Sequence, residues 1–176
     1  MITTKRTVLR KMIPNDAESV FRYRSDKTTN KYQGFIPETV EEVQNFISKI
    51  PEHINEPETW FQMVIIEIDS QRIIGDIGLH FYGNENKQVE IGCTLDKEYQ
   101  NKGYASESLT SIMEYLFIEL DKHRITGSID PQNTNSAKLM ERLGFRKEAH
   151  FLESLYIDGK WVDDIIYAYL KKHWKR

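Results

Sequence analysis

Apolar and polar residues alternate along several stretches of the chain in the pattern of β-strands. Successive side chains of a strand point to opposite faces, so a half-buried strand has an apolar residue at every second position. Runs rich in β-branched and aromatic residues predict seven strands, at residues 7–10, 61–68, 73–82, 88–95, 124–129, 147–157 and 162–170. Polar residues 69–72 join the second and third of these strands, and Asp158-Gly159 predicts a hairpin turn between the last two.

Four other stretches repeat their apolar residues at the spacing of an amphipathic helix. The first begins at Pro14-Asn15-Asp16, and Thr39 caps the second, with Glu42 completing a capping box. The third covers residues 104–120, and the fourth runs from about 134 to 143. The order β-α-α-β-β-β-α-β-α-β-β predicts an α/β (α+β) fold, with a mixed, mostly antiparallel central sheet of about seven strands and about four helices on both faces.

The composition is that of one globular domain. A chain of 176 residues with 39 % hydrophobic and 29 % charged residues has the length and balance of a single domain, which we expect to span residues 1–176. The 24 basic and 27 acidic residues give a net charge of −3. General nucleic-acid binders carry a basic excess, so this balance argues against that class.

The sequence carries no sign of secretion or membrane insertion. Residues 1–6 contain no apolar segment of a signal peptide, and no apolar run approaches the ~20 residues that span a bilayer. The single cysteine, Cys93, cannot form an internal disulfide. We therefore expect a cytoplasmic protein without membrane contact. Cys93 is also a candidate nucleophile, but its apolar strand, without a neighbouring His or Asp, favours a structural thiol.

The residues between the fourth predicted strand and the third helix form a candidate phosphate-binding loop. They read Gln100-Asn101-Lys102-Gly103-Tyr104-Ala105 and open directly into the helix. The first N–H groups of a helix lack intrahelical partners, and the positive end of its dipole adds to their attraction for a phosphate or pyrophosphate. The loop matches neither a P-loop nor the dinucleotide motif G-x-G-x-x-G. The alternative interpretation is an ordinary strand–loop–helix connection with a glycine turn.

With two further segments, this loop resembles the GNAT (GCN5-related N-acetyltransferase) superfamily. Gln100-x-x-Gly103-x-Ala105 is similar to the acetyl-CoA pyrophosphate loop of that family, and Asn133-x-x-Ser136, followed by Leu143-Gly144-Phe145, is similar to its second cofactor segment. The strand at Glu90-Ile91-Gly92 and the C-terminal end rich in Tyr and Trp most resemble the ribosomal-protein N-terminal acetyltransferase (RimJ/RimL-type) branch. The resemblance covers about residues 7–170. It implies a splayed pair of central strands between which cofactor and substrate meet.

The resemblance implies transfer of the acetyl group of the cosubstrate acetyl-CoA to a primary amine. The amine is a protein N-terminus or a small molecule, and it attacks directly in a ternary complex. The loop backbone and Ser106 would hold the pyrophosphate, Leu95 and Asn133 the pantetheine arm, and two lysines the phosphate oxygens. Asn133 can cap its helix as well. The expected cofactor-binding residues are Leu95, Gln100, Asn101, Lys102, Gly103, Tyr104, Ala105, Ser106, Asn133 and Lys138.

Two residues are candidates for the catalytic proton transfers. Glu90 is a lone acid in an apolar strand, and acids of this strand deprotonate the amine in parts of the resembled family, directly or through water. Its alternative role is an exposed strand carboxylate. Ser136 is the candidate for protonating the CoA thiolate, because it shares a helix face with Leu139 and Leu143 and should point inward. Its alternative role is a helix cap. Met140 stands where many members carry a tyrosine acid, which favours Ser136.

Two other functions remain open at this point. A noncatalytic acyl-CoA-binding or sensing module on the same fold would keep the loop but would not need Glu90 or Ser136. A structural domain without a cofactor would require the agreement of all the motifs to be a coincidence. No pair of His, Cys or acidic residues has metal-ligand spacing, so we expect no metal.

The C-terminal hairpin and the remaining aromatic residues lead to two further expectations. An exposed edge of the hairpin makes a homodimer plausible. The aromatic residues outside the cofactor segments are expected mainly in the core, and they are Tyr32, Phe35, Trp60, Phe81, Tyr82, Tyr156 and Trp161.

Overall fold

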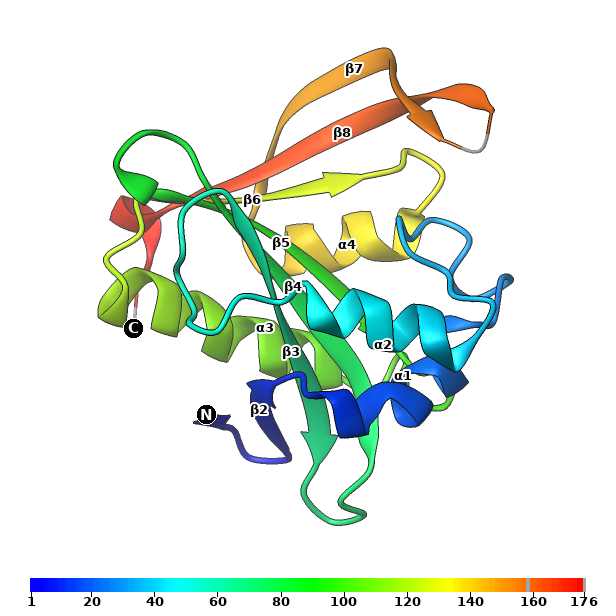
Figure 1. Cartoon of the computed structure of the whole chain (residues 1–176). Helices are drawn as coiled ribbons and strands as arrows, with labels where there is room; N and C mark the ends of the chain where they lie inside the picture. The colour runs from blue at the N-terminus through cyan, green and yellow to red at the C-terminus, as the bar shows by residue number, and fades with distance from the viewer. Residues whose placement is uncertain (158, 176) are drawn as a thin grey trace.

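The computed structural model describes residues 1–157 and 159–175, and its centre is one eight-stranded sheet in the order β1-β2-β3-β4-β5-β6-β8-β7. The strands are β1 (Ile2–Thr3), β2 (Thr7–Lys11), β3 (Thr59–Glu67), β4 (Ile73–Tyr82), β5 (Gln88–Leu95), β6 (Arg124–Ile129), β7 (Arg146–Ile157) and β8 (Lys160–Leu170). Every neighbouring pair is antiparallel except β5 and β6, which are parallel. At one edge, β7 and β8 project as a long hairpin (Figure 1).

Helices cover both faces of the sheet, and each face has its own apolar core. The helices are α1 (Ala17–Arg24), α2 (Val40–Ser48), α3 (Tyr104–Glu114) and α4 (Thr134–Arg142). On one face, apolar residues of α1 and α2 pack against Val64 of β3. On the other, α3 and Met140 of α4 pack against the alternate residues of β3, β4 and β5. The apolar faces that the sequence patterns predicted for strands and helices thus pack together in two separate layers.

The predicted fold is confirmed, with one strand added. All seven predicted strands and all four helices are present in the predicted order. The additional strand, β1, pairs with β2 over only two residues, which is too short to show an alternating pattern. The last turns of the predicted third helix, at Tyr115–Glu119, form a π-helix. In the predicted hairpin turn, Gly159 has a φ of 78° that suits glycine, whereas Asp158 lies outside the described residues.

The parallel strands β5 and β6 separate after a short paired segment. Their register joins Gln88 to Arg124 and Glu90 to Thr126, and pairing ends there. Because β5 continues to Leu95 and β6 to Ile129, the sheet opens into a V with Glu90 at its apex. Backbone groups along the inner edge of β5 are consequently left for a partner other than a strand. The splay implied by the family resemblance is present.

The expectation that the remaining aromatic residues pack in the core is wrong for three of them. Phe81 is buried, but Trp60, Tyr156 and Trp161 are largely exposed. Tyr156 and Trp161 lie on the hairpin, where little else covers the sheet, and their rings pack against each other at 5.2 Å. In the part of the chain that the structure describes, no helix is long and apolar enough to cross a membrane.

Candidate active site

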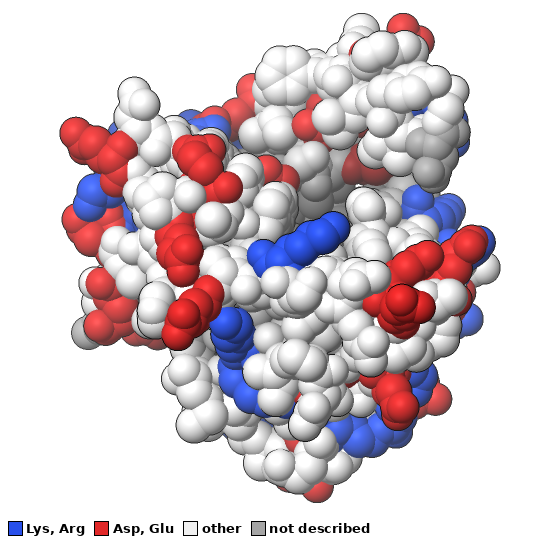
Figure 2. Space-filling model, in the orientation of Figure 1, with Lys and Arg blue, Asp and Glu red and all other residues white. Residues whose placement is uncertain are grey.

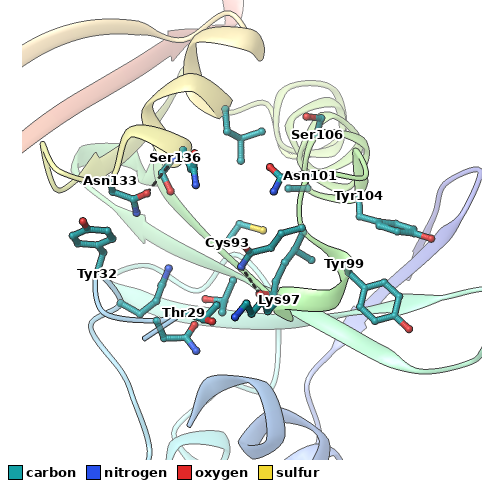
Figure 3. A pocket seen from close by; sticks show the side chains of 18 of the residues that line it. Thr29, Tyr32, Cys93, Lys97, Tyr99, Asn101, Tyr104, Ser106, Asn133 and Ser136 are labelled. Atoms are coloured by element: carbon teal, nitrogen blue, oxygen red, sulfur yellow. Dashed lines mark hydrogen bonds between the residues drawn. The ribbon is translucent and has the colours of Figure 1, made fainter. Parts of the chain in front are cut away.

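A groove of about 700 Å³ opens beside the V between β5 and β6 (Figure 3). Its walls come from four segments that are distant in the sequence: residues 28–33, the end of β5, the loop into α3, and the start of α4. The side chain of Tyr32 faces the start of α4, and its hydroxyl donates a hydrogen bond to the carbonyl oxygen of Gln132 at 3.3 Å. The segment between α1 and α2 is therefore attached to the opposite wall of the groove.

The predicted phosphate loop has the backbone conformation of an anion site. Gly103 is the N-cap of α3 and has a φ of 85°, a left-handed conformation that glycine adopts without a steric cost. Within the described chain, no side chain caps this helix, so the N–H groups of its first turn are available to a ligand. Asn101 also has a positive φ, of 59°. The loop thus combines two left-handed residues with a helix start that no described side chain caps.

Arg6 supports the loop from outside the groove. Its Nη1 atom donates to the carbonyl oxygen of Lys102 at 3.0 Å, and its Nε atom donates to the Glu107 carboxylate at 2.7 Å. Glu107 also accepts from the backbone N–H of Arg6 and from the hydroxyl of Thr4. The chain segment before β2 therefore fixes the loop against the first turn of α3.

The charge of the groove suits a polyanion. Its charged lining residues are Lys31, Lys97 and Arg142, and no acidic residue is among the described lining residues. This is notable in a chain that carries three more acidic than basic residues. Arg142 also donates from Nε to the Ser106 hydroxyl at 3.3 Å, which links α4 to α3 across the groove. Backbone N–H groups with three cations fit a pyrophosphate and an additional phosphate.

At the start of α4, Asn133 and Ser136 face the groove together (Figure 3). The Asn133 side-chain oxygen accepts a hydrogen bond from the backbone N–H of Ser136 at 3.2 Å, so Asn133 is the N-cap. The capping role considered for Asn133 is therefore present, and its Nδ2 group remains for a ligand. Ser136 Oγ has no hydrogen-bond partner among the described residues, so it is the hydroxyl available to a bound molecule in this wall.

Glu90 lies outside the groove lining, at the apex of the V. Its side chain is half-buried and makes no hydrogen bond or ion pair within the described chain. Burial, and secondly the negative charge of Asp164, raise the pKa of the Glu90 carboxyl. A carboxylate with a raised pKa accepts a proton more readily at neutral pH, which suits a general base.

Cys93 lines the groove without the features of a nucleophile. Burial, with a contribution from the charge of Asp76, raises the pKa of the Cys93 thiol to about 12. The reactive thiolate is therefore a negligible fraction at neutral pH. The structural interpretation of this residue agrees with that environment.

The structure brings most of the predicted cofactor residues together. All of them line the groove except Lys102 and Lys138. The Lys102 ammonium lies over the ring of Tyr99, 5.7 Å from its centroid. The Tyr104 side chain points away from the groove toward Glu67 (Figure 3) and contributes its backbone instead.

Sequence reasoning missed three parts of this site. Residues 28–33 belong to a loop without regular pattern, and Lys97 is one lysine among many. Arg142 had a usable signal, because Ser136, Leu139 and Arg142 follow one another at i+3 spacing and form one ridge of α4. Among the described residues, no group of three or more His, Cys, Asp or Glu side chains is arranged to hold a metal ion.

Comparison with known proteins identifies the same family over most of the chain. Residues 6–146 match the acetyltransferase (GNAT) domain. An uncharacterized N-acetyltransferase of Bacillus subtilis, YnaD, is 35 % identical over 176 residues. The alignment covers 98 % of this chain and 98 % of YnaD. The [ribosomal protein uS5]-alanine N-acetyltransferase of Escherichia coli is 34 % identical over 84 residues, which are 48 % of this chain and 43 % of that enzyme.

A solved structure shows the same fold over nearly the whole chain. The crystal structure of an acetyltransferase of the GNAT family from Bacillus anthracis aligns with a TM-score of 0.87 at 32 % identity. The alignment covers 98 % of this chain and 99 % of that one.

Proposed function

Because the chain belongs to the GNAT acetyltransferase family and is an N-acetyltransferase that uses acetyl-CoA, we propose that its groove binds acetyl-CoA and that Glu90 and Ser136 act on the two sides of the thioester. The observation that carries this proposal is the V between β5 and β6. Glu90 lies at its apex, and Ser136 lies in the wall beside its opening. We therefore assign the two candidate proton-transfer groups to opposite sides of the thioester.

The cofactor-binding roles follow from the groove. We assign the pyrophosphate to the backbone N–H groups of residues 100–106, with Lys97 and Arg142 as nearby cations. The pantetheine arm would lie along the unpaired edge of β5 near Leu95, in the place that a neighbouring strand takes elsewhere in the sheet. Asn133 Nδ2 would donate to this arm. Lys102 and Lys138 are left with at most a peripheral role.

The chemistry then needs two proton transfers. Glu90 accepts a proton from the acceptor ammonium, directly or through water, and the freed amine attacks the thioester carbonyl carbon. The carbon–sulfur bond breaks and the sulfur leaves as a thiolate. The attacking nitrogen loses its second proton as the amide forms, and the Ser136 hydroxyl relays that proton to the thiolate, so the serine itself ends unchanged. We propose direct attack in a ternary complex; burial raises the pKa of the Cys93 thiol to about 12, which argues against an acetylated cysteine intermediate.

Replacing Ser136 with alanine should lower kcat roughly 100-fold, the usual contribution of a positioned proton donor. The Kd of acetyl-CoA should change less than about threefold, because backbone groups hold the pyrophosphate. The measurements are release of free thiol and isothermal titration with acetyl-CoA. Ser48→Ala, at the exposed end of α2, is the matched control and should retain wild-type turnover. Unchanged kcat in Ser136→Ala would remove this residue from the mechanism.

Replacing Glu90 with glutamine should alter the pH profile of kcat/KM. In the wild type, activity should fall as the pH drops through the Glu90 pKa, which is raised above its usual 4.5, because the protonated acid cannot accept a proton. In Glu90→Gln that acid limb should be absent and kcat/KM at neutral pH roughly 100-fold lower. Deprotonation of the amine itself produces a second limb at higher pH, which both proteins should share. Identical profiles would exclude Glu90 as the base.

A screen of amines tests the proposed function as a whole. Acetyl-CoA would be incubated with the protein and a panel of N-terminal peptides, spermidine, amino sugars and amino acids, and free thiol would be measured. Sustained turnover with one amine class supports an enzyme. Binding of acetyl-CoA without turnover on any amine would favour the alternative, a noncatalytic acyl-CoA-binding module.

Three further expectations stay proposals. We propose a single domain over residues 1–176, supported by one sheet that includes both the first and the last strands. We also propose cytoplasmic location and no general nucleic-acid binding. A homodimer through the exposed apolar residues of the β7–β8 hairpin can be tested by sedimentation.

A further inference from the structure

One end of the sheet face that carries α1 and α2 is left open. The register aligns Trp60 with His80, His80 with Glu90, and Glu90 with Thr126, so these residues form one row across four strands. Directly paired residues of neighbouring strands point to the same face. Figure 2 shows the surface hollowed between the projecting hairpin and the lobe of α1 and α2, with a basic side chain along its lower border and acidic side chains to either side. In the proposed reaction, this row of residues would lie on the side from which the acceptor amine approaches.

An aromatic stack forms one side of this open face. The rings of Trp60 and His80 are nearly parallel, at 7°, with centroids 4.8 Å apart. The Tyr82 ring follows at 5.5 Å from His80, and the Tyr82 hydroxyl lies 3.1 Å from the Thr126 hydroxyl. Trp60 remains 44 % exposed although it is held in place by this stack. A rigid, partly exposed aromatic surface of this kind favours another flat apolar group.

Two glycines and a buried amide lie next to the stack. Gly78 and Gly92 are register partners, one row from Glu90. A Cβ atom at Gly92 would have no heavy atom within 4 Å, so the space above it is open. Gln62 lies next to Gly78, is only 6 % exposed, and its Oε1 atom has no hydrogen-bond partner among the described residues. This oxygen has less than 1 Å² of exposed area, so it lies beneath the surface that a ligand would contact.

Two carboxylates complete the surface. Glu90 has no ion-pair partner, and Asp164 accepts a hydrogen bond from the Ser128 hydroxyl at 2.7 Å, without a Lys or Arg partner in the described chain. The neighbouring Glu148, in contrast, is paired with Arg124 and Arg146. The open face therefore offers negative charge to an ammonium at one place, beside an aromatic wall.

We infer that the acceptor is a primary amine that carries an aromatic ring, with its ammonium at Glu90 and its ring on the Trp60–His80–Tyr82 stack. This inference rests on the proposed function and specifies its acceptor. Neighbouring strands lie about 4.8 Å apart, so His80 and Trp60 are about 5 and about 10 Å from the strand position of Glu90. An arylethylamine and an N-terminal aromatic residue both match this separation of amine and ring.

The test compares amines and variants. Initial rates of thiol release would be measured with 2-phenylethylamine, n-butylamine, spermidine, and short peptides beginning with Phe or Ala. We expect kcat/KM for an aromatic amine to exceed that for n-butylamine at least 10-fold. Comparing 2-phenylethylamine with the Phe peptide shows whether the acceptor is an arylethylamine or an N-terminal aromatic residue. Trp60→Leu should reduce this preference about 10-fold, and Trp60→Phe should restore most of it. Trp161→Leu is the matched control, because Trp161 is 61 % exposed on the hairpin.

A second series uses the open space above Gly92. Gly92→Ala and Gly92→Val should raise KM for the aromatic amine progressively, while the Kd of acetyl-CoA stays within about threefold of the wild type. Equal rates for butylamine, spermidine and aromatic amines, or a Trp60→Leu variant that keeps its preference, would overturn the inference while leaving the acetyltransferase intact. Binding of acetyl-CoA without turnover on any amine would instead contradict the proposed function, and the inference with it.

Discussion

Replacing Gly103 with glutamate is expected to abolish acetyl-CoA binding, with a Kd at least 100-fold higher than that of the wild type. Gly103 has a φ of 85°, and a residue with a Cβ atom pays about 1–2 kcal/mol to adopt this conformation. A Cβ atom here would lie 3.3 Å from Arg6 Nη2, so the arginine that supports the loop would also have to move. A carboxylate beside the first turn of α3 would in addition repel the pyrophosphate and attract Arg6 and the helix N-terminus to itself.

Two controls separate these causes. Gly103→Ala keeps the backbone strain without the charge, and it should weaken binding by roughly 10-fold, the effect of ~1.4 kcal/mol. Gly159→Glu introduces the same residue at a φ of 78° in the hairpin turn, where a Cβ atom meets nothing within 4 Å. This control should bind acetyl-CoA as the wild type does. Isothermal titration measures all four proteins, and a Gly103→Glu variant with wild-type affinity would contradict the assignment of the loop.

The largest loss of stability is expected from Asp76→Asn. Asp76 is fully buried in β4, and its two oxygens accept hydrogen bonds from Arg24 Nη2 at 2.6 Å and Arg24 Nε at 2.8 Å. The Tyr23 hydroxyl donates to the same carboxylate at 2.5 Å. Removing the negative charge leaves the buried Arg24 guanidinium without a counter-charge. Breaking a buried pair in this way costs about 3–5 kcal/mol, which chemical denaturation followed by circular dichroism would measure.

The contacts of Arg24 predict that Asp76→Asn also affects the groove. Arg24 Nη1 also donates to the carbonyl oxygen of Phe35 at 3.0 Å, which anchors the segment that supplies residues 28–33 to the groove wall. Asp76→Asn should therefore weaken acetyl-CoA binding as well as stability. Glu38→Gln, which removes the exposed ion pair with Lys27, is the control and should leave the denaturation midpoint unchanged. A midpoint for Asp76→Asn equal to that of the wild type would show that the pair adds no net stability.

Local patterns in the sequence were sufficient to predict the order of the strands and helices. Period-2 and period-3.6 repeats depend on neighbouring residues, so the strands at 73–82 and 88–95 and the helix from Tyr104 could be found without any knowledge of what they pack against. The phosphate loop was recognisable for the same reason, because Gly103 and the helix start that it caps are adjacent in the chain. Ser136 and its cap Asn133 are likewise three residues apart.

Features that depend on distant contacts could not be predicted from these patterns. The support of the loop by Arg6 joins residues separated by about a hundred positions, and nothing around Arg6 marks it. The two residues of β1 show no alternation, and they form a strand because β2 lies beside them. The exposure of Trp60 was predicted wrongly. The sequence of its strand indicates burial, and only the structure shows that α1 and α2 leave this end of the sheet face open.

The amino-acid sequence alone was enough for the family, the element order and the residues of the two cofactor motifs, since each is encoded by residues close together in the chain. Only the tertiary structure decided where β5 and β6 part, which cations line the groove, and which residues face the acceptor. Glu90 illustrates the difference: its sequence neighbours indicate a strand, but its raised pKa and its place at the apex of the V arise from β6, and from Asp164 of β8, more than seventy residues later. Pairing between distant strands, rather than local preference, brings those groups together.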